Sequence, residues 1–227
     1  MQVTYQHLSQ KSIGQVVTEH PELVKVFMEY EIDFCCGGDR SLEEAVRRDT
    51  DEIEALKEAV TVALAHAFQV PMNGRNIKLS SLSDAELIDK IINTHHAYLR
   101  GVLPEVSTLL FKLLNVHGTA HPELFEVHHI FGGLKTELES HMIKEEKQLF
   151  PALLNKQDGL ADLIGVLEAE HDGAGDALHK LTEITDHFKV PKDGCKTYEL
   201  AYAKLKELVA DMYMHVHTEN NILFKRV

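Results

Sequence analysis

Two short stretches of this chain carry a histidine and a glutamate four residues apart in otherwise apolar surroundings. The stretch SHMIKEEKQL contains His141 and Glu145, and the stretch MHVHTENNIL contains His215 and Glu219. Residues at positions i and i+4 of a helix lie one above the other on the same face, so each pair presents an imidazole nitrogen and a carboxylate oxygen to one point in space. Two such pairs predict a single metal site.

Apolar residues recur at helical intervals almost throughout the 227-residue chain, which predicts an all-α protein. Beyond Ser83, helix caps and breakers divide the sequence into four long helices at about residues 83–116, 122–155, 160–188 and 195–224. The short connections between them favour antiparallel neighbours, so we expect an up-down-up-down four-helix bundle. Pro104 and Pro151 lie inside these spans and should each kink a helix or end it early.

Each of the four helices carries a histidine in the apolar row that should face the bundle core. In the first helix this row is predicted to be Ala85, Ile88, Ile92, His96, Leu99, Leu103, Val106 and Leu110. In the second helix it is predicted to be Val127, Phe131, Leu134, Leu138, His141, Glu145 and Leu149. The third row contains His171, and the fourth contains His215 and Glu219. His95 would replace His96 if the first helix rotated by one residue, but the apolar row of His95 is less continuous.

The four histidines of these rows also lie at similar depths in an antiparallel bundle. Counted from the start or the end of each helix, as its direction requires, they lie about 9 to 13 residues along, which places them within about 6 Å of one another in height. Unrelated core histidines would scatter over the roughly 45 Å length of a thirty-residue helix. A single histidine on an apolar face is more often an ordinary core residue, but the matched depths favour convergence on one point.

Four imidazoles and two carboxylates are too many ligands for one tetrahedral zinc ion, so two metal ions are implied. Mixed nitrogen and oxygen ligands suit iron or manganese, and buried glutamates would be costly without cations beside them. Glu170 precedes one of these histidines and either supports the site from behind, lines an access path or is a solvated surface glutamate. The predicted ligand set is His96, His141, Glu145, His171, His215 and Glu219.

The formal net charge of −13 disfavours nucleic acid and anionic membrane surfaces as partners, because both require clustered positive charge. No apolar run reaches the roughly 20 residues of a membrane-spanning helix, and the first ten residues lack the basic-then-apolar pattern of a signal peptide. The three cysteines are an odd number and two are adjacent, unlike a secreted disulfide framework. We therefore expect a cytoplasmic protein with reduced thiols.

The chain before the bundle is predicted to be a separate unit. Residues 1–66 should form a small helical N-terminal domain, 67–81 a linker and 82–227 the bundle. Ser41 and Glu44 form a capping box that starts a helix directly after the glycine-rich turn EIDFCCGGDR.

Cys35 and Cys36 lie in that glycine-rich turn. They are candidates for redox groups, for a transient ligand pair for iron or a cluster, for a strained vicinal disulfide, or for plain buried thiols. Cys195, near the start of the last helix, is predicted to be structural.

At these residues the sequence resembles the hemerythrin-like di-iron proteins, and specifically the iron-sulfur cluster repair proteins of the RIC family, which includes YtfE and ScdA. The segments that carry the resemblance are, in chain order, DFCCGGDRSLEEA, INTHHAYLRGVLPE, HMIKEEKQLFP, EAEHDGAG and HVHTENNILFK. VHGTAHPEL and the tail LFKRV are most similar to the ScdA branch. These motifs occur in the family's order across nearly the whole chain.

The resemblance implies a carboxylate-bridged centre of two non-haem iron ions, in which the four histidines are terminal ligands and Glu145 and Glu219 bridge. In oxygen-carrying hemerythrins the third helix supplies a second histidine one turn after the first, whereas this chain has Gly175 there. One coordination position is therefore expected to be open or water-filled, which fits reactivity or iron release better than stable oxygen carriage. The resemblance also favours a chemical role for Cys35 and Cys36.

The leading hypothesis, which the resemblance carries, is repair of iron-sulfur clusters damaged by nitrosative or oxidative stress, with the iron centre supplying iron to damaged iron-sulfur proteins as clients. A sensor or reversible binder of nitric oxide or oxygen is a second hypothesis, and a di-iron oxidoreductase acting on nitric oxide is a third. No general acid or base can be named from the sequence, so enzyme status stays open. The N-terminal unit is a candidate contact in a homodimer or a candidate docking surface for a client.

Overall fold

The computed structural model describes residues 4–69 and 78–227, and these residues form helices and connecting turns with no β-strand among them. The all-α prediction is therefore confirmed. Contacts group the chain into two compact units, one formed by Asp84–Met212 and the other by the residues up to Ser83 together with Tyr213–Val227. Within the described part of the chain, no helix is both long and apolar enough to cross a membrane.

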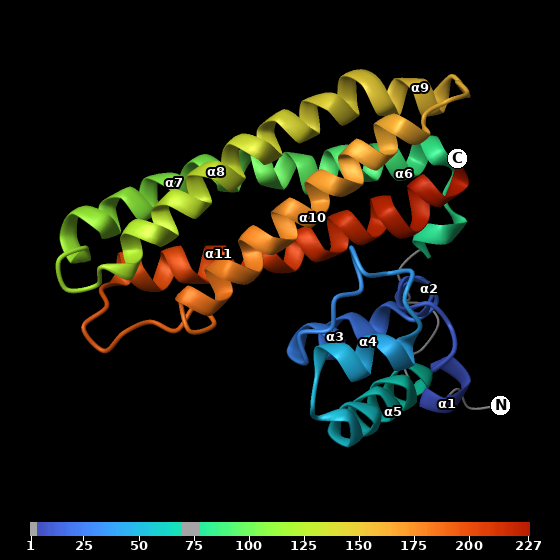
Figure 1. Ribbon diagram of the computed structural model, residues 1–227, viewed down its shortest axis with the longest axis horizontal. Helices are drawn as coiled ribbons and strands as arrows, with labels where there is room; N and C mark the ends of the chain where they lie inside the picture. The colour runs from blue at the N-terminus through green and yellow to red at the C-terminus, as the bar shows by residue number, and fades with distance from the viewer. Residues whose placement is uncertain (1–3, 70–77) are drawn as a thin grey trace. The chain divides into compact units, whose positions relative to one another are not determined.

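The unit of Asp84–Met212 is a bundle in which the long helix α8 packs against both α7 and α10. Its elements are α6 (Asp84–Ile91), η4 (Ile92–His96), α7 (Ala97–His117), α8 (Glu123–Lys144), η5 (Glu145–Leu149), α9 (Phe150–Leu154), α10 (Ala161–Ile184) and α11 (Lys196–Thr218), whose last residues belong to the other unit. Successive long helices reverse direction, as the colour gradient of Figure 1 shows, which confirms the up-down-up-down bundle. Pro104 lies inside α7 without ending it, and Pro151 lies in the first turn of α9, where its missing N–H needs no helical partner.

Helix α10 is shorter than predicted at its C-terminal end. The sequence pattern predicted a helix to about residue 188, but α10 ends at Ile184. The backbone then turns through three consecutive residues with left-handed angles, since φ is 48° at Asp186, 58° at His187 and 59° at Phe188. The Phe188 N–H donates to the Thr185 hydroxyl oxygen at 3.0 Å, which gives this turn a hydrogen bond that a continuing helix would not need.

Three helical segments contain a π-helical turn at the place where the sequence predicts a metal ligand. Turn η4 (Ile92–His96) ends on a predicted ligand, whereas η5 (Glu145–Leu149) and η6 (Glu219–Leu223) each begin on one. A π turn adds about one residue to a helical turn and is frequent at functional sites. The regular 3.6-residue period used for the sequence prediction does not include this insertion.

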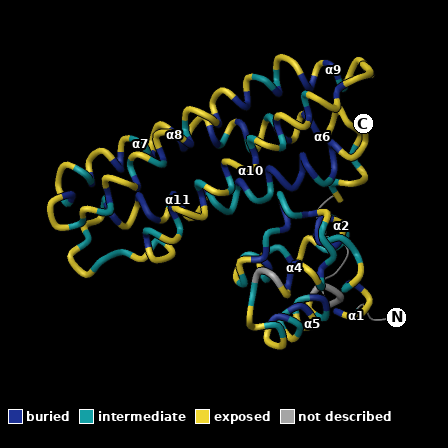
Figure 2. Tube along the Cα trace, in the orientation of Figure 1, coloured by how far each residue is buried: buried dark blue, intermediate teal, exposed yellow. Residues whose placement is uncertain are grey.

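The extra residue of η4 changes which side chains of the first long segment face the core. Ala85 is exposed and Ile92 is only half-buried, so the prediction placed both wrongly, whereas Leu87 and Ile91 are buried. The buried row thus steps five residues from Ile91 to His96 instead of four. Figure 2 shows the buried residues on the inner side of the bundle helices. The row of α8 and η5 is buried as predicted, at Val127, Phe131, Leu134, Leu138, His141, Glu145 and Leu149.

The other unit consists of short helices around an apolar core of its own. Its elements are α1 (Tyr5–Leu8), α2 (Ile13–Glu19), η1 (Pro21–Leu23), α3 (Val24–Glu29), α4 (Leu42–Asp49), α5 (Ile53–Gln69), η3 (Leu79–Ser81), η6 and η7 (Phe224–Arg226). Phe27 and Phe34 are fully buried in this core, and Tyr213 from the C-terminal segment packs against it. Ser41 and Glu44 form the predicted capping box at the start of α4.

Helix α5 runs to Gln69 and thus extends into the predicted linker. Residues 70–77 of that linker lie outside the described residues, and the short turn η3 follows them.

Candidate metal centre

The predicted ligands of the bundle unit gather around the carboxylate of Glu145. His96 Nε2 lies 3.2 Å from Glu145 Oε2, and His141 Nε2 lies 3.3 Å from Glu145 Oε1. His171 Nε2 lies 2.9 Å from His141 Nε2. All four side chains are buried, and Glu145 is 0% exposed. Helices η4, α8, η5 and α10 therefore place four of the six predicted ligands together.

The polar atoms at the centre of this group have the properties of a cation site. Within the described residues, neither carboxylate oxygen of Glu145 makes a hydrogen bond. His96 and His141 each point Nδ1 at a different carboxylate, so in a neutral ring the proton lies on Nδ1 and the lone pair lies on Nε2. These lone pairs face the oxygens of Glu145, and acceptors that face one another repel unless a cation lies among them. The residues present therefore fit a bound metal.

Two carboxylates hold the imidazoles from behind, one for each of the histidines that face Glu145. Glu146 Oε1 accepts from His96 Nδ1 at 2.7 Å and also pairs with Arg100. Burial acts to raise the pKa of Glu146, but the hydrogen bonds from His96 and Arg100 outweigh it, so the pKa lies below its usual value. Such outer carboxylates fix the tautomer of a metal-binding histidine and raise its basicity.

Glu170 has the same position behind the second histidine. Its Oε2 accepts from His141 Nδ1 at 2.8 Å, and its other oxygen pairs with Lys144. Burial again acts to raise the pKa of Glu170, and the bonds from Lys144 and His141 reverse that effect. The sequence prediction named Glu170 but missed Glu146. A usable signal was present, because Glu146 directly follows a predicted ligand just as Glu170 directly precedes one.

His95 does not take the place of its neighbour. Its Nδ1 lies 2.8 Å from Asp211 Oδ1, and its side chain is partly exposed. His95 is thus held by an acidic side chain of α11, while His96 faces Glu145.

The two remaining predicted ligands lie in the C-terminal segment that belongs to the other unit. His215 Nε2 lies 3.0 Å from Glu219 Oε1, and both side chains are buried. The i, i+4 spacing read from the sequence therefore brings this nitrogen and this oxygen to the same point, at the junction of α11 and η6.

Cys35 and Cys36 lie in a turn of the same unit that Asp33 organises. Asp33 Oδ1 accepts from the backbone N–H groups of Cys35 at 3.0 Å and Cys36 at 3.1 Å, and Oδ2 accepts from Gly37 N–H at 2.9 Å. Both cysteines are free thiols with their sulfurs 3.8 Å apart. The hydrogen bond to Cys36, together with burial, raises the pKa of Cys35 well above its usual value. Ligand atoms of Asp33, Cys35 and Cys36 lie within 4.8 Å of one another, so this group could also hold a metal ion.

Two family models match the chain. The hemerythrin HHE cation-binding domain matches residues 87–227, and a domain of unknown function named ScdA_N matches residues 9–63. A probable iron-sulfur cluster repair protein of Haemophilus influenzae is 33% identical over 220 residues, which cover 96% of this chain and 97% of the relative. The chain belongs to the family of iron-sulfur cluster repair proteins.

Relatives in both named branches of the iron-sulfur cluster repair family are similar to this chain. ScdA of Staphylococcus haemolyticus is 30% identical over 94% of this chain and 96% of its own length. YtfE of Musicola paradisiaca is 33% identical over 97% of each chain. The hemerythrin match spans all six predicted ligands, and the ScdA_N match spans Cys35 and Cys36. The match to the hemerythrin domain implies that this family member binds iron.

Cys195 is not the structural residue that the sequence predicted. Its side chain is exposed, and its sulfur lies 3.3 Å from His117 Nε2. The hydrogen bond with His117, with further bonds from backbone N–H groups at the start of α11, lowers the pKa of Cys195 to about 7. A surface thiol with this pKa is substantially ionised at neutral pH and therefore reactive.

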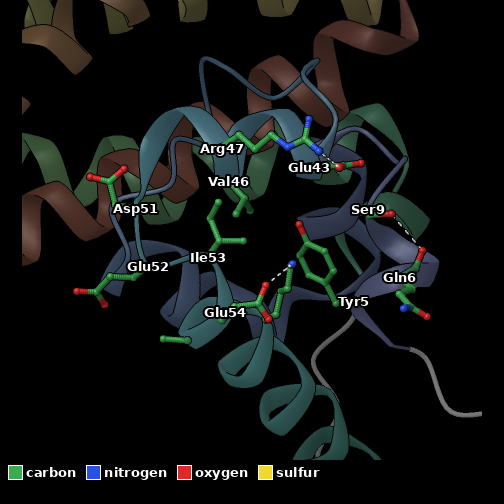
Figure 3. Close-up of a pocket in the computed structure, with 12 residues that line it drawn as sticks. Tyr5, Gln6, Ser9, Glu43, Val46, Arg47, Asp51, Glu52, Ile53 and Glu54 are labelled. Carbon is green, nitrogen blue, oxygen red and sulfur yellow. Dashed lines mark hydrogen bonds and ion pairs between the residues drawn. The ribbon is translucent and has the colours of Figure 1, made fainter.

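A hollow on the N-terminal unit, shown in Figure 3, has no comparable set of buried polar groups among the residues that line it. Its charged side chains pair with one another instead, Arg47 with Glu43 at 2.5 Å and Lys57 with Glu54 at 2.7 Å. We assign it no function.

Proposed function

We propose that this protein repairs iron-sulfur clusters damaged by nitrosative or oxidative stress, and that it does so by supplying iron from a carboxylate-bridged centre of two non-haem iron ions. The observation that carries the proposal is the buried carboxylate of Glu145, which makes no hydrogen bond within the described residues and is faced by the Nε2 lone pairs of His96 and His141. The relatives are named iron-sulfur cluster repair proteins, and these names support cluster repair as the process.

The proposed ligands are the six residues predicted from the sequence. In support, His96, His141 and His171 gather around Glu145 within the bundle unit, and His215 lies beside Glu219 in the C-terminal segment. Each set thus has one buried carboxylate beside imidazole nitrogens, and Glu145 and Glu219 are the proposed bridging ligands. Two bridging carboxylates carry two negative charges, which divalent cations would offset at a depth where unpaired charge is costly.

The outer carboxylates have a defined task in this proposal. Glu146 and Glu170 keep the Nδ1 protons of His96 and His141 in place, so that each Nε2 lone pair stays directed at the metal position. Arg100 and Lys144 hold these carboxylates and remain partly solvated. Both ion pairs are therefore points at which protons or competing anions can loosen the histidines from outside.

The chemistry of iron at this place would be transfer of ferrous iron to a damaged client, with binding of nitric oxide or oxygen species as a second capacity. Gly175 offers no side chain where the oxygen carriers have a further histidine, so one coordination position is proposed to be open. Cys35 and Cys36 are proposed to assist as redox groups or as a transient iron-binding pair, and free thiols of this kind fit a cytoplasmic location.

Reactivation of a cluster-depleted dehydratase tests the proposal. The iron-loaded protein is incubated anaerobically with the dehydratase, and the recovered activity is compared with that from free ferrous iron at the same concentration. We expect faster and more complete recovery with the protein, and no gain with the Glu145→Gln variant prepared in the same way. Equal recovery from free ferrous iron and from the loaded protein would contradict the repair function.

A further inference from the structure

Asn221 connects the cysteine turn to the π turn that carries Glu219. Its side-chain amide donates to the backbone carbonyl of Cys35 at 2.9 Å and to that of Phe34 at 3.3 Å. Asn221 is the third residue of η6, whose first residue is Glu219. The Asn221 side chain therefore links the backbone at Cys35 to the short turn that positions Glu219, a proposed metal ligand.

Two glycines provide the space for this side chain. A Cβ atom at Gly14 would lie 2.1 Å from Asn221 Oδ1, and one at Gly38 would lie 2.0 Å from the same oxygen, both far closer than side chains approach one another. The two glycines are held together by a hydrogen bond of 2.9 Å from Gly14 N–H to the Gly38 carbonyl. The Asn221 side chain therefore occupies a cradle formed by Gly14 and Gly38, and a Cβ atom at either glycine would fill that space.

The segment before η6 is fixed to the same turn by aromatic contacts. The ring centroid of Phe34 lies 5.5 Å from that of Tyr213 and 5.8 Å from that of His217. The His217 ring is buried beside Phe34. With Asn221 on one side of Glu219 and His217 on the other, movement of the cysteine turn must displace the backbone that holds Glu219.

We infer that Asn221 is a positioning residue that couples the Cys35–Cys36 turn to Glu219, so that chemical change at these thiols weakens metal binding and metal binding restrains the thiols. The inference rests on the proposed function in taking Glu219 as a metal ligand. Because coupling between two sites is reciprocal in free energy, a state of the thiols that weakens metal binding is itself disfavoured when metal is bound. Couplings of this kind commonly amount to a factor between about 5 and 150, and we expect about tenfold here.

The experiment uses the full chain in a Cys195→Ser background and Mn²⁺ as the probe, because this ion prefers nitrogen and oxygen ligands to thiolates. Iodoacetamide alkylates Cys35 and Cys36: the thiolate sulfur displaces iodide, a carbon–sulfur bond forms and the thiol proton passes to the buffer. Mn²⁺ affinity is measured by equilibrium dialysis before and after alkylation. The alkylation rate of each cysteine is measured by peptide mass spectrometry with and without Mn²⁺.

We expect alkylation to weaken Mn²⁺ binding about tenfold and Mn²⁺ to slow the alkylation of both thiols. Asn221→Ala should remove both effects, and Gly38→Ala should do the same because its Cβ would displace Asn221 from the cradle. Asn115→Ala is the matched control, since Asn115 bonds only its own helix at the Phe111 carbonyl among the contacts described, and it should keep both effects. If Asn221→Ala fails to fold, Asn221→Asp, which has the same shape but lacks the amide donors, takes its place.

The outcomes separate this inference from the proposed function. Tight Mn²⁺ binding that does not depend on the state of the thiols, or coupling that survives in the Asn221 variant, would overturn the role of Asn221 and leave the metal centre intact. Absence of Mn²⁺ and Fe²⁺ binding in the unmodified chain would overturn the metal centre and this role together.

Discussion

Replacing Glu145 by glutamine removes the central charge of the candidate site while almost conserving the volume of the side chain. A unit positive charge at 3.2 Å from a carboxylate oxygen, the separation of His96 Nε2 from Glu145 Oε2, gains about 5 kcal/mol at an effective dielectric constant of about 20. That energy corresponds to between three and four powers of ten in affinity, part of which desolvation offsets. We therefore expect Glu145→Gln to weaken ferrous iron binding by at least about 100-fold.

Thermal unfolding under anaerobic conditions measures this loss. Ferrous iron at about 100 times the wild-type dissociation constant should stabilise the wild-type protein by about 2.7 kcal/mol, which raises the Tm by roughly 5 to 10 °C for a chain of this size. The Glu145→Gln variant should show almost no rise, and its metal-free form should be at least as stable as the wild type because a buried charge has been removed. Glu139→Gln, an exposed position on α8, is the control and should behave as the wild type. A full iron-dependent rise in the Glu145→Gln protein would refute the assignment of Glu145 as a ligand.

Three further predictions concern the surroundings of the site and the bundle that holds it. Glu170→Gln should weaken iron binding about 10- to 100-fold in an anaerobic titration, because His141 loses the carboxylate that fixes its tautomer. Alkylation of Cys195 should rise with pH around a midpoint near 7, because the thiolate is the reactive form and its pKa lies at about 7, and His117→Ala should move that midpoint up toward 9.0. Phe131→Ala should lower the free energy of unfolding by about 3 to 5 kcal/mol in urea, whereas Phe125→Ala at a 60% exposed position should change it by less than about 0.5 kcal/mol.

Each of these predictions has an outcome that would count against it. Unchanged iron affinity in the Glu170→Gln protein would mean that this carboxylate is only a surface group. An alkylation midpoint near 9 in the unmodified chain would show that His117 does not activate the thiol. Similar losses of stability in the two phenylalanine variants would contradict the placement of Phe131 in the core and Phe125 on the surface.

The histidine and glutamate rows were predictable because they depend only on helical periodicity and on chain direction. The row of α8 from Val127 to Leu149 is buried throughout, and His96, His141 and His171 meet around Glu145 as the matched depths required. In such cases the spacing in the sequence determines which side chains face the core, because a long amphipathic helix buries its single apolar face.

The π turns were not predictable from that periodicity. An inserted residue stretches the step from Ile91 to His96, which exposes Ala85 and leaves Ile92 at the edge of the core. The end of α10 at Ile184, followed by residues with left-handed backbone angles, was also not predictable, since neither glycine nor proline marks that position in the sequence.

The roles of residues that act through long-range contacts could not be predicted from the sequence either. Glu146 directly follows a predicted ligand in the sequence, but it acquires its role only by meeting His96 across the bundle. Asn221 and Cys195 are similar cases. Asn221 contacts the Cys35 carbonyl and Cys195 contacts the imidazole of His117, and both partners lie far away along the chain. Tertiary context, rather than propensity, decides such roles.

Iron stoichiometry tests the central claim most directly. The protein is reconstituted anaerobically with ferrous iron, freed of unbound metal and assayed for iron per chain, beside a His141→Ala variant whose fold is verified by circular dichroism. The proposed six-ligand centre predicts about two irons per wild-type chain, with an optical spectrum of a bridged ferric pair after oxidation, and loss of at least one iron from the variant. Two irons per chain retained in the folded His141→Ala protein would contradict the site.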